Sequence, residues 1–104
     1  MKNLIFLGTS KADLRNFPVS ARRDVGIELH QVQFGLEPSN WKPMPNIGPG
    51  VREIRVRAGG AFRIIYLATR PEGVYVLHCF QKKSQQTALS DIELARTRYK
   101  QIGG

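Results

Sequence analysis

The chain has 104 residues, with 16 Lys and Arg against 8 Asp and Glu, so its formal net charge is +8. A hydrophobic content of 41% is typical of a folded protein and excludes a disordered polycation. The single cysteine, Cys79, excludes an internal disulfide framework, and one Cys with two His argues against a zinc site.

The lengths of the apolar runs indicate whether the protein enters or crosses a membrane. No run approaches the ~20 residues of a membrane helix, so we expect no membrane partner. The apolar stretch 3–7 is too short for the core of a signal peptide. A lone cysteine fits a reducing compartment. We therefore expect a cytoplasmic protein that forms a single domain over residues 1–104.

The positive charge is concentrated in the second half of the chain. Residues 1–50 contain six basic and four acidic side chains, a difference of +2, whereas residues 51–104 contain ten basic and four acidic ones, a difference of +6. A basic surface attracts polyanions, which makes nucleic acid the leading class of partner. A generally basic surface that serves solubility is the alternative.

The first half predicts one strand and two helices. Residues 3–7 form a short buried strand, and Ser10 is expected to cap a short helix through about residue 16. After Pro18, Ser20 is expected to cap a second helix, for which Gly35 is the stop. Its apolar stripe is Ala21, Val25, Leu29, Val32 and Leu36. Residues 37–50 hold four of the six prolines and are expected to form a loop.

The second half predicts three strands and a helix. Residues 51–58 alternate, with Ile54 and Val56 on one face and charged residues on the other. Gly59-Gly60 forms a hairpin turn. Residues 61–69 and 74–80 are strands that are apolar on both faces, apart from one charged or polar residue each.

A last helix follows from a stripe at helical spacing. The stripe is Ala88, Ile92, Ala95, Tyr99 and Ile102. Thr87 or Ser90 is expected to cap this helix, with Ser90 and Glu93 as a capping box and Leu89 and Leu94 as a hydrophobic staple. The predicted order is β-α-α-β-β-β-α. It indicates a small α+β fold in which the N-terminal strand joins an antiparallel meander and helices pack on the sheet.

A few cations on or beside the apolar strands are the candidates for chemistry. Arg63 interrupts an apolar strand, and an unpaired buried guanidinium is costly. It therefore either pairs with Glu53 on the neighbouring strand or faces a cleft that binds an anion. Arg55 and Arg57 share a strand face, and an antiparallel neighbour would bring Arg63 beside them. Lys82 and Lys83 end the third of these strands, as functional groups or as ordinary surface lysines.

His78 lies on a strand that looks buried, either as a satisfied core histidine or as a catalyst. The sequence has no phosphate-binding glycine loop, no nucleophile elbow and no cluster of carboxylates for Mg²⁺. If this protein cleaves a phosphodiester, the catalysts are cationic and no metal or other cofactor is needed. That chemistry suits RNA, which supplies its own 2′-hydroxyl nucleophile.

Two segments carry a resemblance to a known family. V-R-E-I-R-V-R-A-G-G-A-F-R-I-I-Y, followed by V-Y-V-L-H-C-F-Q-K-K-S-Q-Q-T, resembles the RelE/ParE superfamily of toxins, and most of all its phage-associated, HigB-like branch. The resemblance covers about residues 42–100. It implies the toxin of a type II toxin–antitoxin pair that cleaves mRNA on the ribosome without metal. The implied partner is an antitoxin, usually a helix-turn-helix protein.

The resemblance also implies roles for individual residues. Arg63 matches the strand arginine that contacts the scissile phosphate. Lys83 matches a second basic catalytic position with Lys82 beside it, and His78 belongs to the pattern without a fixed role. The residues expected to bind RNA are Arg55, Arg57, Arg52 and Lys42.

Two other functions stay open at this point. The superfamily includes toxins that inhibit DNA gyrase without acting as enzymes, and the chain can also be an inactive nucleic-acid-binding domain. The basic strand face counts mildly against the gyrase inhibitor.

Overall fold

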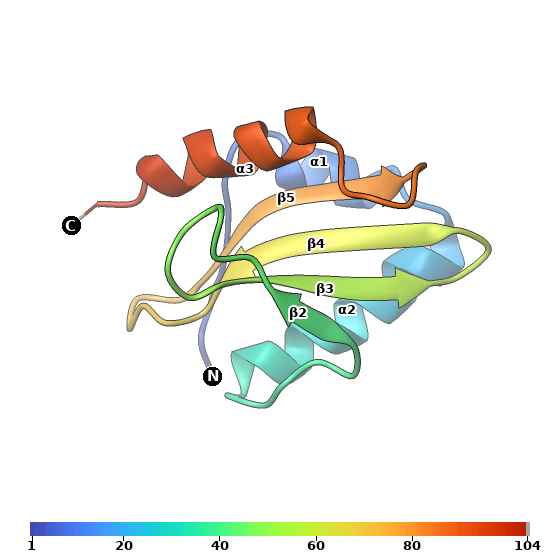
Figure 1. The fold of residues 1–104 in the computed structure, drawn as a ribbon. Coiled ribbons are helices and arrows are strands. Elements are labelled where there is room, and N and C mark those ends of the chain that lie inside the picture. The colour runs from blue at the N-terminus through green and yellow to red at the C-terminus, as the bar shows by residue number, and fades with distance from the viewer. Residues whose placement is uncertain (104) are drawn as a thin grey trace.

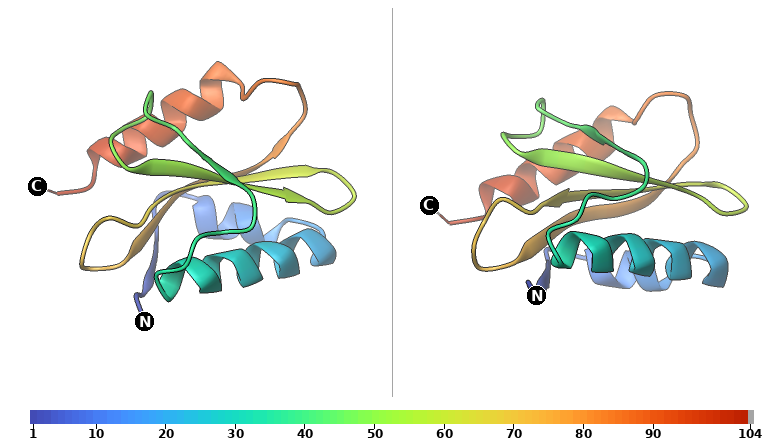
Figure 2. Two further views of the ribbon diagram at one scale, coloured as in Figure 1. Left: turned by 60° about the horizontal axis from the view of Figure 1, so that its bottom comes forward. Right: turned by 90° about the horizontal axis from the view of Figure 1, so that it is seen from below.

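The computed structural model describes residues 1–103 and contains a mixed sheet with helices on both faces (Figures 1 and 2). The elements in chain order are β1 (Leu4–Phe6), α1 (Ser10–Arg15), α2 (Val19–Gln33), β2 (Trp41–Pro43), β3 (Val51–Arg57), β4 (Ala61–Leu67), β5 (Val74–Lys82) and α3 (Leu89–Lys100). The strand order is β1-β5-β4-β3-β2. Only β1 runs parallel to its neighbour, β5, so the predicted meander with an added N-terminal strand is confirmed.

The sheet separates two apolar layers. Helices α1 and α2 cover one face, where the predicted stripe Ala21, Val25, Leu29 and Val32 packs against Ile54 and other strand residues. Helix α3 and the segment between β2 and β3 cover part of the other face, through side chains such as Ala95 and Ile47. Figure 2 shows the sheet edge-on between these layers. The α+β class predicted from the sequence is therefore correct.

The predicted loop 37–50 contains a strand that the sequence analysis missed. β2 pairs antiparallel with β3, and Lys42 lies opposite Glu53. Pro43 ends this edge strand, a position where its missing N–H costs no interior ladder hydrogen bond. The observed order is therefore β-α-α-β-β-β-β-α.

The predicted starts of all three helices are wrong. Ser10 is the first residue of α1, and Thr9 takes the capping position that was predicted for Ser10. α2 begins at Val19, because the Pro18 carbonyl already accepts a hydrogen bond from the Arg22 N–H at 2.9 Å, and Ser20 lies within the first turn. α3 begins at Leu89 with Ala88 at the capping position and no side-chain cap. Thr87 donates its hydroxyl hydrogen bond elsewhere, to Glu53.

The apolar stripes are correct in the middle of each helix and wrong at one end. Gly35 stops α2 as predicted, with φ +81°, so Leu36 lies beyond the helix and is 59% exposed. The predicted staple does not form a buried contact, because Leu89 and Leu94 are both exposed. Ala88 precedes α3, whereas Ile92, Ala95, Tyr99 and Ile102 pack on the sheet as expected.

A β-bulge at Leu77 changes which side chains of β5 face α3. Ile65 pairs with His78 and Tyr66 pairs with Val76, which leaves Leu77 as the extra residue. In a bulge two residues oppose one on the partner strand. Leu77 packs in the α3 layer, and His78 contacts Asp91 of α3, so two consecutive residues face the same side.

Candidate functional site: a basic cluster on the sheet

Three predicted arginines lie together on the α3 side of the sheet. Arg55 lies directly opposite Arg63 in the β3–β4 pairing, and Arg57 lies one step further along β3. Lys82 at the end of β5 belongs to the same region, because Ala61 pairs with both Arg57 and Lys82. The antiparallel register therefore assembles the arginine patch that the sequence predicted.

Helix α3 leaves this end of the sheet open. Its apolar residues cover Val51, Leu67 and Leu77, which lie toward the other end of the central strands. Arg57 is exposed at the β3–β4 turn, whereas Arg63 is 8% exposed beneath its neighbours. The cations thus lie at the edge of the covered region, where a ligand can reach the outer ones.

Glu53 is the acidic centre of the cluster and is fully buried. Its Oε1 lies 3.9 Å from Lys42 Nζ, 3.8 Å from Arg55 Nε and 3.7 Å from Arg63 Nε. Its Oε2 accepts a hydrogen bond from the Thr87 hydroxyl at 3.1 Å. The predicted Arg63–Glu53 pair is therefore present, and one carboxylate is shared among cations from three strands.

The sharing leaves hydrogen-bonding capacity unused. Within residues 1–103, Glu53 Oε1, Arg55 Nε and Arg63 Nε are buried and make no hydrogen bond. Arg63 Nη1 donates to the Phe62 carbonyl at 3.0 Å. A single negative charge faces several positive ones, so the cluster keeps a net positive charge and attracts anions.

The electrostatics of the cluster shift two pKa values. Burial lowers the pKa of Arg63, and Glu53 opposes this shift while Arg55 and Arg57 add to it. Partial burial also lowers the pKa of Lys82, with the charge of Arg63 as the next cause. A lysine with a lowered pKa transfers protons more readily near neutral pH.

Arg55 lines three hollows, and in two of them every charged residue is a cation of the cluster. The smaller, about 110 Å³, is lined by Arg55, Arg57 and Arg63 together with Asn40 and Val56. The larger, about 440 Å³, includes Lys42, Arg55 and Lys82 in its lining. Arginine forks match the oxygen atoms of a phosphate, so the smaller hollow is suited to a phosphate group.

The three remaining predicted residues lie outside the hollow that the arginines line. His78 is buried, its Nε2 lies 2.7 Å from Asp91 Oδ1, and its ring stacks on Phe80. Lys83 is exposed just after β5. Arg52 does not join the cluster: it lies opposite Tyr66 on the α2 face, 3.9 Å from the centre of the Trp41 ring.

Sequence reasoning missed three contributors to the region. Thr87 was interpreted as a helix cap, and Asp91 carried no signal as the partner of His78. Asn40 lines the smaller hollow because β2 brings it beside β3, where its carbonyl accepts a hydrogen bond from the Arg55 N–H at 2.9 Å. The missed strand is the reason that Asn40 was not considered.

A comparison with protein families identifies the kind of protein that carries this cluster. The family described as Phage derived protein Gp49-like (DUF891) matches residues 12–100. The chain belongs to this family. Gp49-like proteins are RelE/ParE-like toxins, which agrees with the resemblance in the two strand segments and supports an antitoxin as partner.

No curated protein matches this Gp49-like chain. In residues 1–103 no helix has both the length and the apolar character to cross a membrane. The same residues hold no group of three His, Cys, Asp or Glu side chains placed to bind a metal ion.

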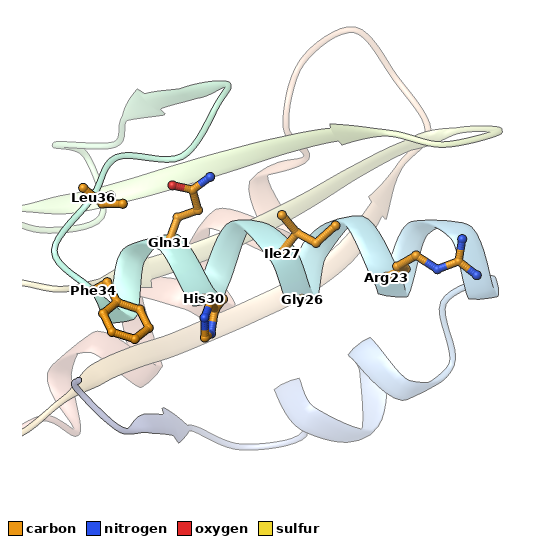
Figure 3. Close-up of a pocket in the computed structure, with 7 residues that line it drawn as sticks. All are labelled: Arg23, Gly26, Ile27, His30, Gln31, Phe34 and Leu36. Carbon is orange, nitrogen blue, oxygen red and sulfur yellow. The ribbon is translucent and has the colours of Figure 1, made fainter.

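The Gp49-like chain has a second, chemically different surface on α2. An apolar groove of about 490 Å³ runs along the outer side of this helix, past Gly26, Ile27 and Phe34 (Figure 3). Arg23 and His30 are the ionisable residues in its lining. It lies on the opposite face of the sheet from the basic cluster and is not part of the candidate site.

Proposed function

We propose that this protein is the toxin of a type II toxin–antitoxin pair, of the HigB-like branch, and that it cleaves mRNA on the translating ribosome without a metal ion. The observation that carries this proposal is the hollow lined by Arg55, Arg57 and Arg63 beside a lysine of lowered pKa. Membership of a toxin family supports the same reading.

In the proposed cleavage of the RNA phosphodiester, Arg63 and the two lysines have separate roles. The 2′-hydroxyl of the RNA attacks the neighbouring phosphorus and gives its proton to water. Arg63 stabilises the extra negative charge on the phosphorane, which is the largest contribution expected from a fixed cation. The 5′-oxygen leaves and takes a proton from Lys82, with Lys83 next to it. The products are a 2′,3′-cyclic phosphate and a 5′-hydroxyl.

The other predicted residues serve binding in this scheme. Arg55, Arg57 and Lys42 hold the phosphates of the RNA backbone, because all three lie on the α3 side of the sheet around the hollows. Arg52 is on the other face and is left out. We also leave His78 out of the reaction, because the residue is only 6% exposed and its second ring nitrogen, Nδ1, is buried as well.

We propose a helix-turn-helix antitoxin as the partner, in keeping with the HigB-like branch. A ribosome-bound substrate places the toxin in the cytoplasm.

The test compares the wild type with Arg63→Ala after induction in cells, by mapping the ends of mRNA. We expect new mRNA ends and growth arrest with the wild type, and loss of both with Arg63→Ala. Arg23→Ala is the matched control, because it removes one positive charge from the opposite face of the sheet. Equal growth arrest by Arg63→Ala, with no new ends in either case, would contradict the nuclease.

Assays of the purified chain discriminate the other functions left open by the sequence. Inhibition of DNA supercoiling by the purified chain, without mRNA cleavage, would identify a gyrase inhibitor. Binding to nucleic acid with neither effect would identify an inactive binding domain.

A further inference from the structure

The proposed reaction does not account for the larger hollow, the one lined by Lys42, Arg55 and Lys82. It lies beside the arginine hollow, with Arg55 between them. Its lining comes from β2 and the segment after it, β3, the end of β5, the loop that follows β5 and the first turn of α3. At about 440 Å³ it lies within the ~300–1,000 Å³ range of small-molecule sites.

The buried Glu53 fixes one wall of this hollow. It holds Lys42 and Arg55 at ion-pair distance through Oε1 and accepts the Thr87 hydroxyl hydrogen bond through Oε2. These three lining residues come from β2, β3 and the loop before α3. A single carboxylate therefore positions parts of the wall that are far apart in sequence.

Two further contacts involve the remaining walls, one between elements and one within a loop. Arg96 of α3 donates two hydrogen bonds to the Asn46 carbonyl, at 3.1 and 2.8 Å. In the loop after β5, the Ser84 hydroxyl donates to the Gln86 carbonyl at 2.6 Å. The Glu53 and Arg96 contacts thus link separate elements of the wall before any ligand binds, and such ordering lowers the entropic cost of binding.

The chemistry of the lining changes from one part of the hollow to another. Lys42, Arg55 and Lys82 supply positive charge next to the arginine hollow, and Met44 and Ile92 supply apolar surface. Gln85 and Gln86 add side-chain amides. These two amides make no hydrogen bond within residues 1–103 and are free to bind a ligand.

We propose that this hollow is a nucleotide subsite, which takes the base adjacent to the scissile phosphate. The cations contact the phosphate and ribose, the apolar side chains contact the face of the base, and Gln85 and Gln86 recognise its edge. Amide side chains form paired donor and acceptor contacts with bases. The assignment rests on the proposed function for the phosphate that is cleaved, but the subsite itself can be tested by binding alone.

The binding test uses the full chain, isotopically labelled, and follows its NMR signals during titration. The probes are the four ribonucleoside 3′-monophosphates and, separately, inorganic phosphate. We expect every probe to shift the signals of Arg55, and only the nucleotides to shift the side-chain amides of Gln85 and Gln86 and the methyl groups of Ile92. Identical shifts with phosphate and nucleotides, or amides that do not move, would overturn the subsite.

The specificity test maps mRNA ends after induction of the Gln85→Ala/Gln86→Ala double variant. We expect cleavage to continue, and its preference for one base beside the cut to fall by roughly tenfold. Gln101→Ala is the matched control, because this glutamine is exposed beyond the end of α3.

A competition in the NMR titration tests for a protein ligand. An acidic peptide that displaces the nucleotides and binds more tightly would assign the hollow to a protein ligand and overturn the proposal.

The two proposals fail in different ways. Absence of cleavage by the wild type contradicts the nuclease, and the NMR titration still decides whether a nucleotide binds. Cleavage with an unchanged base preference in the double variant contradicts the subsite and leaves the nuclease standing.

Discussion

The Oε1 atom of Glu53 lies 3.7 Å from the Nε atom of Arg63, and neither atom makes a hydrogen bond within residues 1–103. The pair is held by charge and burial, because the separation is too long for a hydrogen bond. A carboxylate that is shared in this way balances the guanidinium without occupying its donors. Arg63 therefore keeps N–H groups available for a phosphate while it remains nearly buried.

We predict that Glu53→Gln lowers the free energy of unfolding by about 3 kcal/mol, the size of effect expected when one partner of a buried ion pair is lost. The amide can still accept the Thr87 hydrogen bond, so the loss reports mainly on charge. Chemical denaturation measures it. Added salt should recover part of the stability, because it screens the repulsion among the remaining cations over ~8 Å.

The control for this prediction is Glu93→Gln on the exposed side of α3, which should change stability by less than about 0.5 kcal/mol. If both variants lose the same free energy of unfolding, the buried charge of Glu53 does not stabilise the fold more than an exposed carboxylate does.

We predict that Lys82 loses its proton below the ordinary lysine pKa of 10.5. Burial and the nearby charge of Arg63 disfavour its ammonium form, while Glu53 favours it. Arg63→Ala should therefore raise the pKa of Lys82, and Glu53→Gln should lower it further. The ¹³Cε shifts of the lysines, followed against pH, measure these changes. Shifts of the opposite sign in both variants would rule out the described electrostatics.

The same pKa sets the alkaline limit of the proposed cleavage. If Lys82 donates a proton, the rate falls as pH rises through its pKa, and Lys82→Arg moves this limit to higher pH because a guanidinium keeps its proton. A limit that stays in place in Lys82→Arg assigns proton donation to another residue.

We predict that the Cys79 thiol is inert in the folded protein. Burial raises its pKa from 9.0 to about 12, which reduces the thiolate at a given pH by roughly a thousandfold. Alkylation by iodoacetamide at pH 8, followed by mass spectrometry, should be slow in buffer and fast in denaturant. Equal rates in the two conditions would show that the side chain is accessible.

We predict that Gly8→Ala destabilises the fold by more than its backbone conformation alone requires. Gly8 has φ +56°, and an added Cβ would lie 2.4 Å from Arg98 Nε. The backbone costs about 1–2 kcal/mol in this region. Displacing Arg98 also weakens its hydrogen bonds to the Leu77 carbonyl and the Thr9 hydroxyl, which contributes about 1.5–3 kcal/mol each for a charged donor.

Gly35→Ala is the control for Gly8→Ala, since its φ is +81° and no atom lies within 4 Å of the added Cβ. Thermal or chemical unfolding of both variants separates the two costs. A loss in Gly8→Ala that is no larger than the loss in Gly35→Ala would mean that Arg98 moves without penalty.

The sequence predicts most of the fold because its long elements have strong periodic patterns. The buried stripe of α2 and the alternation of β3 are examples, and the β3–β4 turn at Gly59 follows from local chemistry. β2 has three residues and a proline at its end, which is too short for an alternating pattern to be recognised. The starts of α2 and α3 were wrong because the residues at their capping positions, Pro18 and Ala88, have no capping side chain, and the Thr87 hydroxyl binds Glu53 instead.

The candidate site was predictable where it depends on strand register. Once β3 and β4 form a hairpin, Arg55 must lie opposite Arg63, and Glu53 must share their face. Arg52 is separated from Arg55 by an odd number of positions, so the same alternation places it on the other face. The His78–Asp91 contact could not be predicted, because it depends on the bulge and on where α3 crosses the sheet.

The bulge at Leu77 determines which face of the sheet each half of β5 turns its side chains to. Before it, Val74 and Val76 face the α2 layer beside β1, and after it Phe80 and Lys82 face the opposite side. Side chains alternate along a strand, so regular pairing of the same residues would turn one half over relative to the other. Arg98 of α3 donates a hydrogen bond to the Leu77 carbonyl at 2.9 Å, so α3 stabilises the bulge. Without the bulge, Val74, Val76, Phe80 and Lys82 would all face the same side of the sheet, so the bulge is what lets one strand serve the core beside β1 and the basic cluster on the other face.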